Sequence, residues 1–160
     1  MSHLVGIGYD CHPFADGRRL VLGGVEIPYE RGLGGHSDAD VVTHAVIDAL
    51  LGAAGLGDIG EHFPDTDERH RDADSLVLLR QVVELLASKG LSVVNVDATV
   101  IVESPRLAPH RDRMREALAG ALGTEPTRVS VKATTAEGMG FIGRGEGAAA
   151  LAVASLRADG

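Results

Sequence analysis

The sequence predicts an α/β fold, an α+β sandwich in which helices pack on one face of a single mixed β-sheet. Three observations predict it. Apolar runs with a preference for strand structure alternate with segments in which apolar residues recur at helical spacing. Glycines follow directly after the helical segments and mark their ends. The length of 160 residues fits one domain, so we expect residues 1–160 to form a single unit.

The chain opens with a predicted strand and a predicted hairpin. Residues 4–12 form an apolar run that ends in Asp10-Cys11-His12. Pro13 supports the strand, because the residue before a proline is pushed into an extended conformation. Two short apolar runs flank Gly23-Gly24, which predicts a hairpin over residues 20–27.

A Gly-rich loop at residues 30–35 leads into the first predicted helix. This helix should run from about residue 38 to residue 54, with apolar residues at helical spacing. Ser37, followed three residues later by an acid, resembles a capping box. Gly55-Leu56-Gly57 ends the helix, and a polar loop follows at residues 58–72.

The second half of the chain alternates helix and strand. A helix is expected at about 73–89, and one apolar face of it is formed by Leu76, Leu79, Val83 and Leu86. The clearest strand is 93–103, in which one face carries Val94, Val96, Ala98, Val100 and Val102. A third helix ends near Leu122, and a strand spans 128–134. Residues 145–157 are compatible with a helix or a strand, because they are rich in alanine but contain glycine and valine.

Composition excludes several classes of function. The net charge of -8 argues against non-specific nucleic-acid binding. Cys11 is the only cysteine, so no intramolecular disulfide can form. No apolar stretch approaches the length of a membrane span, and the N-terminus lacks the features of a signal or transit peptide. We therefore expect a soluble cytoplasmic protein without a membrane partner.

Three residues form a candidate metal site. A strand turns Asp10 and His12 to one face and Cys11 to the other, and His44 lies just inside the following helix. Two nitrogens and one carboxylate can hold a divalent ion and leave a position open for substrate. Asp48, one helical turn after His44, is the expected partner of its imidazole. The alternatives are a chance Asp-x-His, a structural histidine and, for Asp48, a solvated helix face.

Further polar groups gather in three loops. His36 and Ser37 precede a helix N-terminus and could donate to phosphate oxygens, although Ser37 also fits a plain cap. The loop from Asp58 to Asp67 could bind sugar hydroxyls or be an ordinary turn. Beyond the strand at 128–134, Thr134 and Thr135 could donate to phosphate, and Glu137 could hold Mg²⁺ or act as a cap. There is no Walker A sequence and no G-x-G-x-x-G after a strand.

Six blocks of sequence together resemble the 2-C-methyl-D-erythritol 2,4-cyclodiphosphate synthase family. They occur in the family's order and cover nearly the whole chain. Each block alone is weakly specific, whereas their joint occurrence is very specific. The blocks are Asp10-Cys11-His12, Ser37 to His44, Gly57-Asp58-Ile59-Gly60, Phe63 to Asp67, Lys132 to Thr135 and Gly143 to Gly147.

The resemblance implies a lyase of the non-mevalonate isoprenoid pathway. Its substrate would be 4-diphosphocytidyl-2-C-methyl-D-erythritol 2-phosphate, whose 2-phosphate attacks the β-phosphorus, so that CMP leaves and a cyclic diphosphate forms. No protein nucleophile is needed, and catalysis is positioning plus charge neutralisation. The resemblance also implies a homotrimer with active sites between subunits.

The same resemblance assigns roles to individual residues. Asp10, His12 and His44 would hold Zn²⁺, and Glu137 would hold Mg²⁺ or Mn²⁺. His36 and Thr135 would stabilise the transition state. Asp58 to Gly60 and Phe63 to Asp67 would hold the methylerythritol end, and Val102 to Ala108, with Thr134, would form the cytidine side. The substrate-binding set comprises Asp10, His12, His36, Ser37, Asp58, Ile59, Gly60, Phe63, Pro64, Asp65, Thr66, Asp67, Val102, Pro105, Arg106, Leu107, Ala108, Thr134, Thr135, Ala136, Glu137, Phe141 and Arg144.

Two departures from the family and two rival functions remain open at this point. Cys11 occupies a variable position, and Ala136 stands where a hydroxyl is common, which bears only on fine substrate binding. Two histidines and one carboxylate also suit Fe(II) in a non-haem oxygenase. A trimeric binding protein that kept the pocket without turnover is the second rival.

Overall fold

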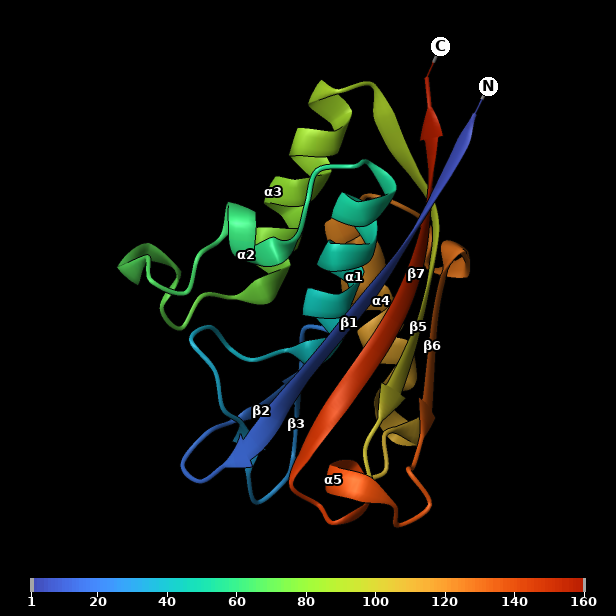
Figure 1. Ribbon diagram of the computed structural model, residues 1–160. Coiled ribbons are helices and arrows are strands. Elements are labelled where there is room, and N and C mark those ends of the chain that lie inside the picture. The colour runs from blue at the N-terminus through green and yellow to red at the C-terminus, as the bar shows by residue number, and fades with distance from the viewer. Residues whose placement is uncertain (1, 160) are drawn as a thin grey trace.

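The structure is a computed structural model that describes residues 2–159, and it contains one mixed five-stranded sheet and a separate hairpin (Figure 1). The strand order in the sheet is β4-β1-β7-β5-β6. Only β5 and β6 run parallel; the other neighbours are antiparallel. The strands are β1 (His3–Ala15), β2 (Leu20–Leu22), β3 (Val25–Ile27), β4 (Gly32–Leu33), β5 (Leu91–Ile101), β6 (Val129–Thr134) and β7 (Gly147–Ala158).

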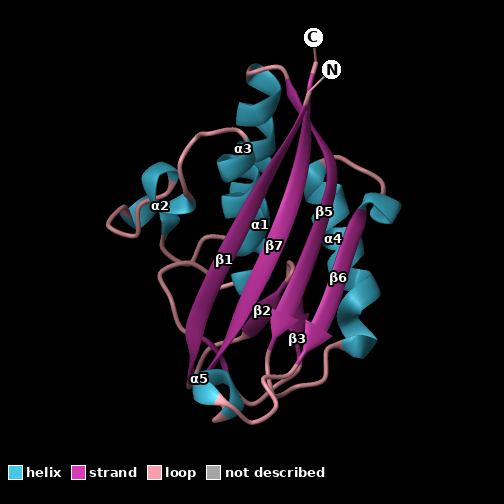
Figure 2. Cartoon of the chain, turned by 45° about the vertical axis from the view of Figure 1, so that its right-hand side comes forward, coloured by secondary structure: helices cyan, strands magenta, loops and turns pink. Residues whose placement is uncertain are grey.

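The long helices cover one face of this sheet. Figure 2 shows β1, β7, β5 and β6 in front, with the long helices α1, α3 and α4 behind them. The mixed sheet with helices on one face is thus confirmed. The helices are α1 (Val41–Ala53), α2 (Ile59–His62), α3 (Ser75–Ser88), α4 (Arg111–Leu122) and α5 (Gly140–Gly143), with 3-10 turns η1 (Glu68–His70), η2 (Ala108–His110) and η3 (Pro126–Arg128). Among the residues described, none of the helices combines the length and the apolar character needed to cross a membrane.

Two glycines in β1 let α1 lie directly on the strand. A Cβ atom built on Gly6 would lie 2.0 Å from the carbonyl oxygen of Ala49, and one built on Gly8 would lie 1.9 Å from that of Ala45. Any side chain at these two positions would therefore push the helix away. Because Asp10 and His12 share this face of β1, the close approach also brings α1 towards them.

The beginning of α1 differs from the prediction. The helix starts at Val41, and its N-cap is Asp40, whose side chain accepts a hydrogen bond from the Thr43 amide. The prediction of a capping box at Ser37 is therefore wrong. Asp40 is fully buried, and it also accepts hydrogen bonds from the amides of Gly23 and Gly24, at 2.8 and 2.7 Å. A buried carboxylate needs such donors, so it binds the hairpin to the helix while it caps α1.

The helices are also buried over more of their surface than a single apolar face would predict. Almost all of α1 is buried, because it contacts β1 and β7 on one side and α3 on another. In α3 the predicted apolar face packs on the core, with Leu79 and Leu86 buried and Leu76 and Val83 partly buried, and Ser75, Leu78 and Val82 are buried as well. The third helix ends as predicted, since Gly123 adopts a left-handed φ of 68° after Leu122.

The two long C-terminal strands complete the sheet. In β5 the predicted alternation is confirmed from Val96 onward, whereas the register shifts between Val93 and Asn95. Residues 145–157, left open by the sequence, form β7 for most of their length. The alanines at 148, 150, 152 and 154 are buried. Small side chains on this face fit the close approach of α1, which contacts β7 as well as β1.

Candidate metal centre and adjoining cavities

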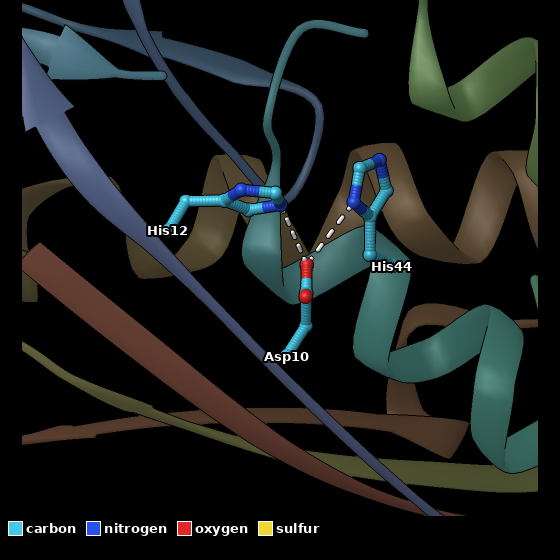
Figure 3. A group of neighbouring side chains, drawn as sticks. All are labelled: Asp10, His12 and His44. Carbon is cyan, nitrogen blue, oxygen red and sulfur yellow. Dashed lines mark hydrogen bonds and ion pairs between the residues drawn. The ribbon is translucent and has the colours of Figure 1, made fainter. Parts of the chain in front are cut away.

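Asp10, His12 and His44 converge as the sequence predicts. Asp10 and His12 project from the helix-facing side of β1, and His44 projects from α1 towards them (Figure 3). The Oδ2 atom of Asp10 lies 3.0 Å from Nε2 of His12 and 3.1 Å from Nδ1 of His44. Cys11 points to the opposite face and is exposed. Two histidines and a carboxylate thus meet at one point.

The donor set and its geometry fit a divalent metal ion. One ligand atom from each of the three residues lies within 4.8 Å of the other two. Nε2 of His12 is buried and has no hydrogen-bond partner among the described residues, although it is close to Asp10. A buried nitrogen without a partner is costly unless something binds it. Two imidazole nitrogens and one carboxylate oxygen suit zinc, with a coordination position left for another ligand.

The charges of the three candidate ligands influence one another. Burial alone would raise the pKa of Asp10, but its close contacts with the imidazoles of His12 and His44, and their charges, outweigh burial and lower the pKa to about 2. Burial likewise opposes protonation of His44. The Asp10 hydrogen bond and charge, together with the charges of Asp40 and Asp38, nevertheless raise the pKa of His44. The site therefore holds a carboxylate anion and favours a cation between the side chains.

The second nitrogen of His44 is held by residues that the sequence did not single out for this role. Nε2 lies 2.8 Å from Oγ of Ser75 and 3.1 Å from Oγ of Ser37. The prediction that Asp48 is the partner of the His44 imidazole is wrong, because the Asp48 carboxylate accepts a hydrogen bond from the Ile59 amide at 2.7 Å. Ser75 is the first residue of α3 and looks like an ordinary helix-start serine, so no local pattern identifies it.

A cavity of about 550 Å³ opens beside the three candidate ligands. It brings together most of the predicted methylerythritol-side residues, together with Gly35, His70 and Leu78, which the sequence analysis missed. Asp58 and Asp67 do not line it, because their side chains cap α2 and η1. The lining residues are Asp10, His12, Gly35, His36, Ser37, His44, Ile59, Gly60, Phe63, Pro64, Asp65, Thr66, His70 and Leu78.

A second cavity of about 180 Å³ lies at the end of β6. It is lined by the residues predicted for the cytidine side and by Glu103, which lies between them in the sequence. Glu103 also anchors the following loop, since its Oε1 accepts a hydrogen bond from the Ala136 amide at 2.6 Å. The lining residues are Val102, Glu103, Pro105, Arg106, Leu107, Ala108, Ala133, Thr134 and Thr135.

The remaining predicted residues stand apart from both cavities. Glu137 is exposed in the loop after β6, and its amide donates to Oγ1 of Thr135 at 3.2 Å. Phe141 and Arg144 belong to α5 and its C-cap, and Arg144 pairs with Glu146. None of Glu137, Phe141 and Arg144 lines the two cavities just described. Within one chain, the structure does not bring these three residues to the candidate metal ligands.

Comparisons with known proteins agree on one family. The model of the YgbB family matches residues 3–157. A 2-C-methyl-D-erythritol 2,4-cyclodiphosphate synthase of Rubrobacter xylanophilus is 65% identical over 158 residues, which cover 97% of this chain and 95% of that protein. A protein of the same name from Symbiobacterium thermophilum is 62% identical over 96% of this chain and 98% of its own length.

Solved structures show the same fold. The bifunctional IspDF of Campylobacter jejuni matches with a TM-score of 0.95 and 43% identity, over 99% of this chain and 43% of that longer chain. IspF of Plasmodium falciparum, in a CDP complex, matches with a TM-score of 0.87 and 30% identity, over 99% of this chain and 98% of its own.

Proposed function

This chain belongs to the YgbB family, and we propose that it catalyses the reaction after which its curated relatives are named. That name is 2-C-methyl-D-erythritol 2,4-cyclodiphosphate synthase. The substrate is 4-diphosphocytidyl-2-C-methyl-D-erythritol 2-phosphate. An oxygen of its 2-phosphate attacks the β-phosphorus, the bond from that phosphorus to the CMP oxygen breaks, and the cyclic diphosphate and CMP are released. The enzyme is accordingly a phosphorus–oxygen lyase of isoprenoid biosynthesis.

The observation that carries the proposal is the convergence of Asp10, His12 and His44 at the wall of the 550 Å³ cavity. These three residues would hold Zn²⁺, and Glu137 would hold Mg²⁺ or Mn²⁺. Bound there, the two ions would neutralise phosphate charge and polarise phosphorus–oxygen bonds. An acidic chain with a net charge of -8 needs such local cations to bind a polyphosphate.

The protein groups around the cavity would orient the two phosphates. His36 and Ser37 lie on the loop that enters α1, where they would donate to phosphate oxygens. Helix α2 and the residues that follow it, up to Thr66, would enclose the methylerythritol end. No side chain needs to attack phosphorus, and Cys11 is turned away from the cavity. The rate enhancement would come from alignment and charge stabilisation.

The second cavity would receive the cytidine. Its walls combine apolar residues with the hydroxyls of Thr134 and Thr135, which suits a base and a sugar phosphate. The CDP complex described for the Plasmodium falciparum relative supports a cytidine nucleotide as ligand. Thr135 would also stabilise the transition state, together with His36.

A homotrimer would bring the two cavities together. Their linings have no residue in common, and a substrate that spans both would use the second cavity of a neighbouring chain. The uncovered face of the sheet is apolar over β1 and β7 and suits burial between subunits. Its exposed side chains are Val5, Ile7, Tyr9, Leu151 and Val153, whose exposed fractions range from 40% to 70%.

The reaction is tested by phosphorus NMR of purified protein with Zn²⁺, Mg²⁺ and the cytidylylated substrate. We expect CMP and a cyclic diphosphate in equal amounts. His44→Ala should lose zinc, and Glu137→Ala should lose turnover while it stays folded. The exposed residue Glu125, changed to alanine, is a control with expected full activity.

Three outcomes would contradict the proposal. The first is simple hydrolysis to an open-chain product. The second is full activity of both His44→Ala and Glu137→Ala. The third is tightly bound iron with oxygen-dependent turnover, which would favour the non-haem oxygenase.

The assembly is tested separately by sedimentation. Ile7→Glu places a charge in the centre of the apolar face, because Ile7 is 70% exposed in the single chain. We expect a trimer for the unaltered chain and smaller species for this variant, since burial of an unpaired charge is costly. Val77→Glu, at an exposed apolar residue of α3, is the control and should stay trimeric. A monomeric unaltered chain would refute the trimer.

A further inference from the structure

The outer nitrogen of His44 begins a chain of hydrogen bonds that ends at a carboxylate. Nε2 of His44 is 2.8 Å from Oγ of Ser75, and the Ser75 hydroxyl donates to Oδ1 of Asp38. The carboxylate of Asp38 is itself held by two amides. The Asp40 amide donates to Oδ1 at 3.1 Å, and the Ser75 amide donates to Oδ2 at 2.9 Å. This series of hydrogen bonds thus connects the start of α3, the loop before α1 and the candidate metal ligand His44.

The direction of each hydrogen bond follows from the chemistry of its groups. An ionised carboxylate can only accept, so the hydroxyl proton of Ser75 points to Asp38. The oxygen of Ser75 is then available to His44 only as an acceptor, and Nε2 must carry a proton to use it. In a neutral imidazole the other nitrogen, Nδ1, is left with a free electron pair. Nδ1 is the atom that faces Asp10 at 3.1 Å.

We propose that Ser75 and Asp38 are positioning residues that fix His44 as an Nδ1 metal ligand. The inference rests on the metal site of the proposed function and adds the residues that orient it. A carboxylate behind the serine hydroxyl strengthens its oxygen as an acceptor, which makes Nδ1 of His44 a better electron donor. The hydrogen bond also fixes the plane of the ring, so Nδ1 remains directed at Asp10 and His12.

The helix start does not itself need the Ser75 hydroxyl. The N-cap of α3 is Asp74, whose side chain accepts a hydrogen bond from the Leu76 amide at 2.9 Å. The hydrogen bond from the Ser75 amide to Asp38 is independent of the side chain. Ser75→Ala therefore leaves the cap and the backbone contact in place and removes only the contact to His44 and its connection to the carboxylate.

Ser37 provides the matched comparison. Its Oγ lies 3.1 Å from the same nitrogen of His44 and accepts a hydrogen bond from the Ala39 amide at 3.3 Å. Unlike Ser75, it makes no hydrogen bond to Asp38 among those that join described residues. If the carboxylate-backed hydroxyl is what matters, the two serines should differ although both contact Nε2.

The test is competition for zinc between the zinc-free full-length chain and a chromogenic chelator. We expect Ser75→Ala and Asp38→Asn to bind zinc about 10- to 100-fold more weakly than the unaltered chain, and Ser37→Ala to change affinity by less than about 3-fold. Circular dichroism and melting of the zinc-free proteins verify folding. Asp38→Asn keeps the size of the side chain, but its NH₂ group would face one of the groups that donate a hydrogen bond to the carboxylate of the unaltered chain.

Nitrogen NMR of the zinc-loaded protein gives a second readout that a purely structural role would not change. The unaltered chain should show the Nε2 proton of His44 shifted downfield and slow to exchange with water. In Ser75→Ala this proton should shift upfield and exchange faster.

Two negative results have different meanings. Zinc affinity within about 3-fold of the unaltered chain, with an unchanged ring proton in Ser75→Ala, would overturn the positioning role alone. Failure of the unaltered chain to bind zinc would instead refute the metal site of the proposed function.

Discussion

Gly8→Ala should disrupt the metal site without altering any polar residue. The added Cβ would lie 1.9 Å from the carbonyl oxygen of Ala45, where ordinary contacts begin at 3.4 Å. The helix and strand backbones must therefore separate by about 1.5 Å at this point, because neither partner is a side chain that can rotate away. Ala45 is the neighbour of His44, so the ligand moves together with the helix.

The magnitude follows from this separation. Overpacking of a core costs about 1–3 kcal/mol, and a contact of backbone against backbone belongs at the upper end of this range. A loss of about 3 kcal/mol corresponds to a fall in melting temperature of about 6–12 °C for a domain of this size. Because a binding site must be held to within about 0.5 Å, we also expect zinc affinity to fall by at least about 10-fold.

The assays are thermal unfolding of the zinc-free protein and competition for zinc with a chelator. Gly52→Ala is the matched control in the same helix, because the nearest atom to its added Cβ is the Ile7 carbonyl oxygen at an ordinary 3.8 Å. This control should raise stability by about 1 kcal/mol, the usual gain for alanine over glycine in a helix. If Gly8→Ala melts like Gly52→Ala and binds zinc equally well, the close approach of α1 to β1 does not hold the site.

Three further predictions concern charge and packing elsewhere. In the zinc-free protein, the lowered pKa of Asp10, about 2 instead of 3.8, contributes about 2 kcal/mol of stability that is present above pH 3.8 and is lost as the pH falls towards 2. The stability difference from Asp10→Asn, followed by urea unfolding against pH, should shrink over that interval, and a constant difference would contradict the shift. Asp40→Asn should cost about 3 kcal/mol in urea unfolding, because an amide NH₂ would face buried backbone N–H donors; a neutral effect would show that the buried carboxylate is dispensable. Gly120→Ala, in α4 with nothing within 4 Å of the new Cβ, should raise the melting temperature by a few degrees, and a lower value would indicate hidden crowding.

Local sequence patterns were enough to predict most of the longer elements and the candidate metal ligands that converge in the structure. Side chains alternate along a strand, so Asp10 and His12 could be assigned to one face and Cys11 to the other without any knowledge of the fold. Glycine after a helical segment was enough to place the end of α4 at Leu122. The family resemblance could also be recognised from the sequence, because it depends on ordered blocks of residues and not on contacts.

The limits of these patterns appear where a residue acts through a distant part of the chain. Ser37 was expected to cap α1, but Asp40 does so, because it also finds donors in the hairpin 16 or 17 residues away. Asp48 has the right helical spacing to support His44, but the Ile59 amide takes its carboxylate. Sequence spacing measures direction within one helix and contains no information about competing partners.

From sequence alone, then, come most of the longer strands and helices, the placement of Asp10 and His12 on the face of β1 opposite to Cys11, and the family. Only the tertiary structure decided that β7 is a strand, that Ser75 and Asp38 lie behind His44, and that the polar residues divide between two cavities. The physical reason is that backbone periodicity is set by neighbours a few residues apart. Packing, by contrast, is set by surfaces such as the glycine face of β1, whose partner helix lies about 40 residues further along the chain.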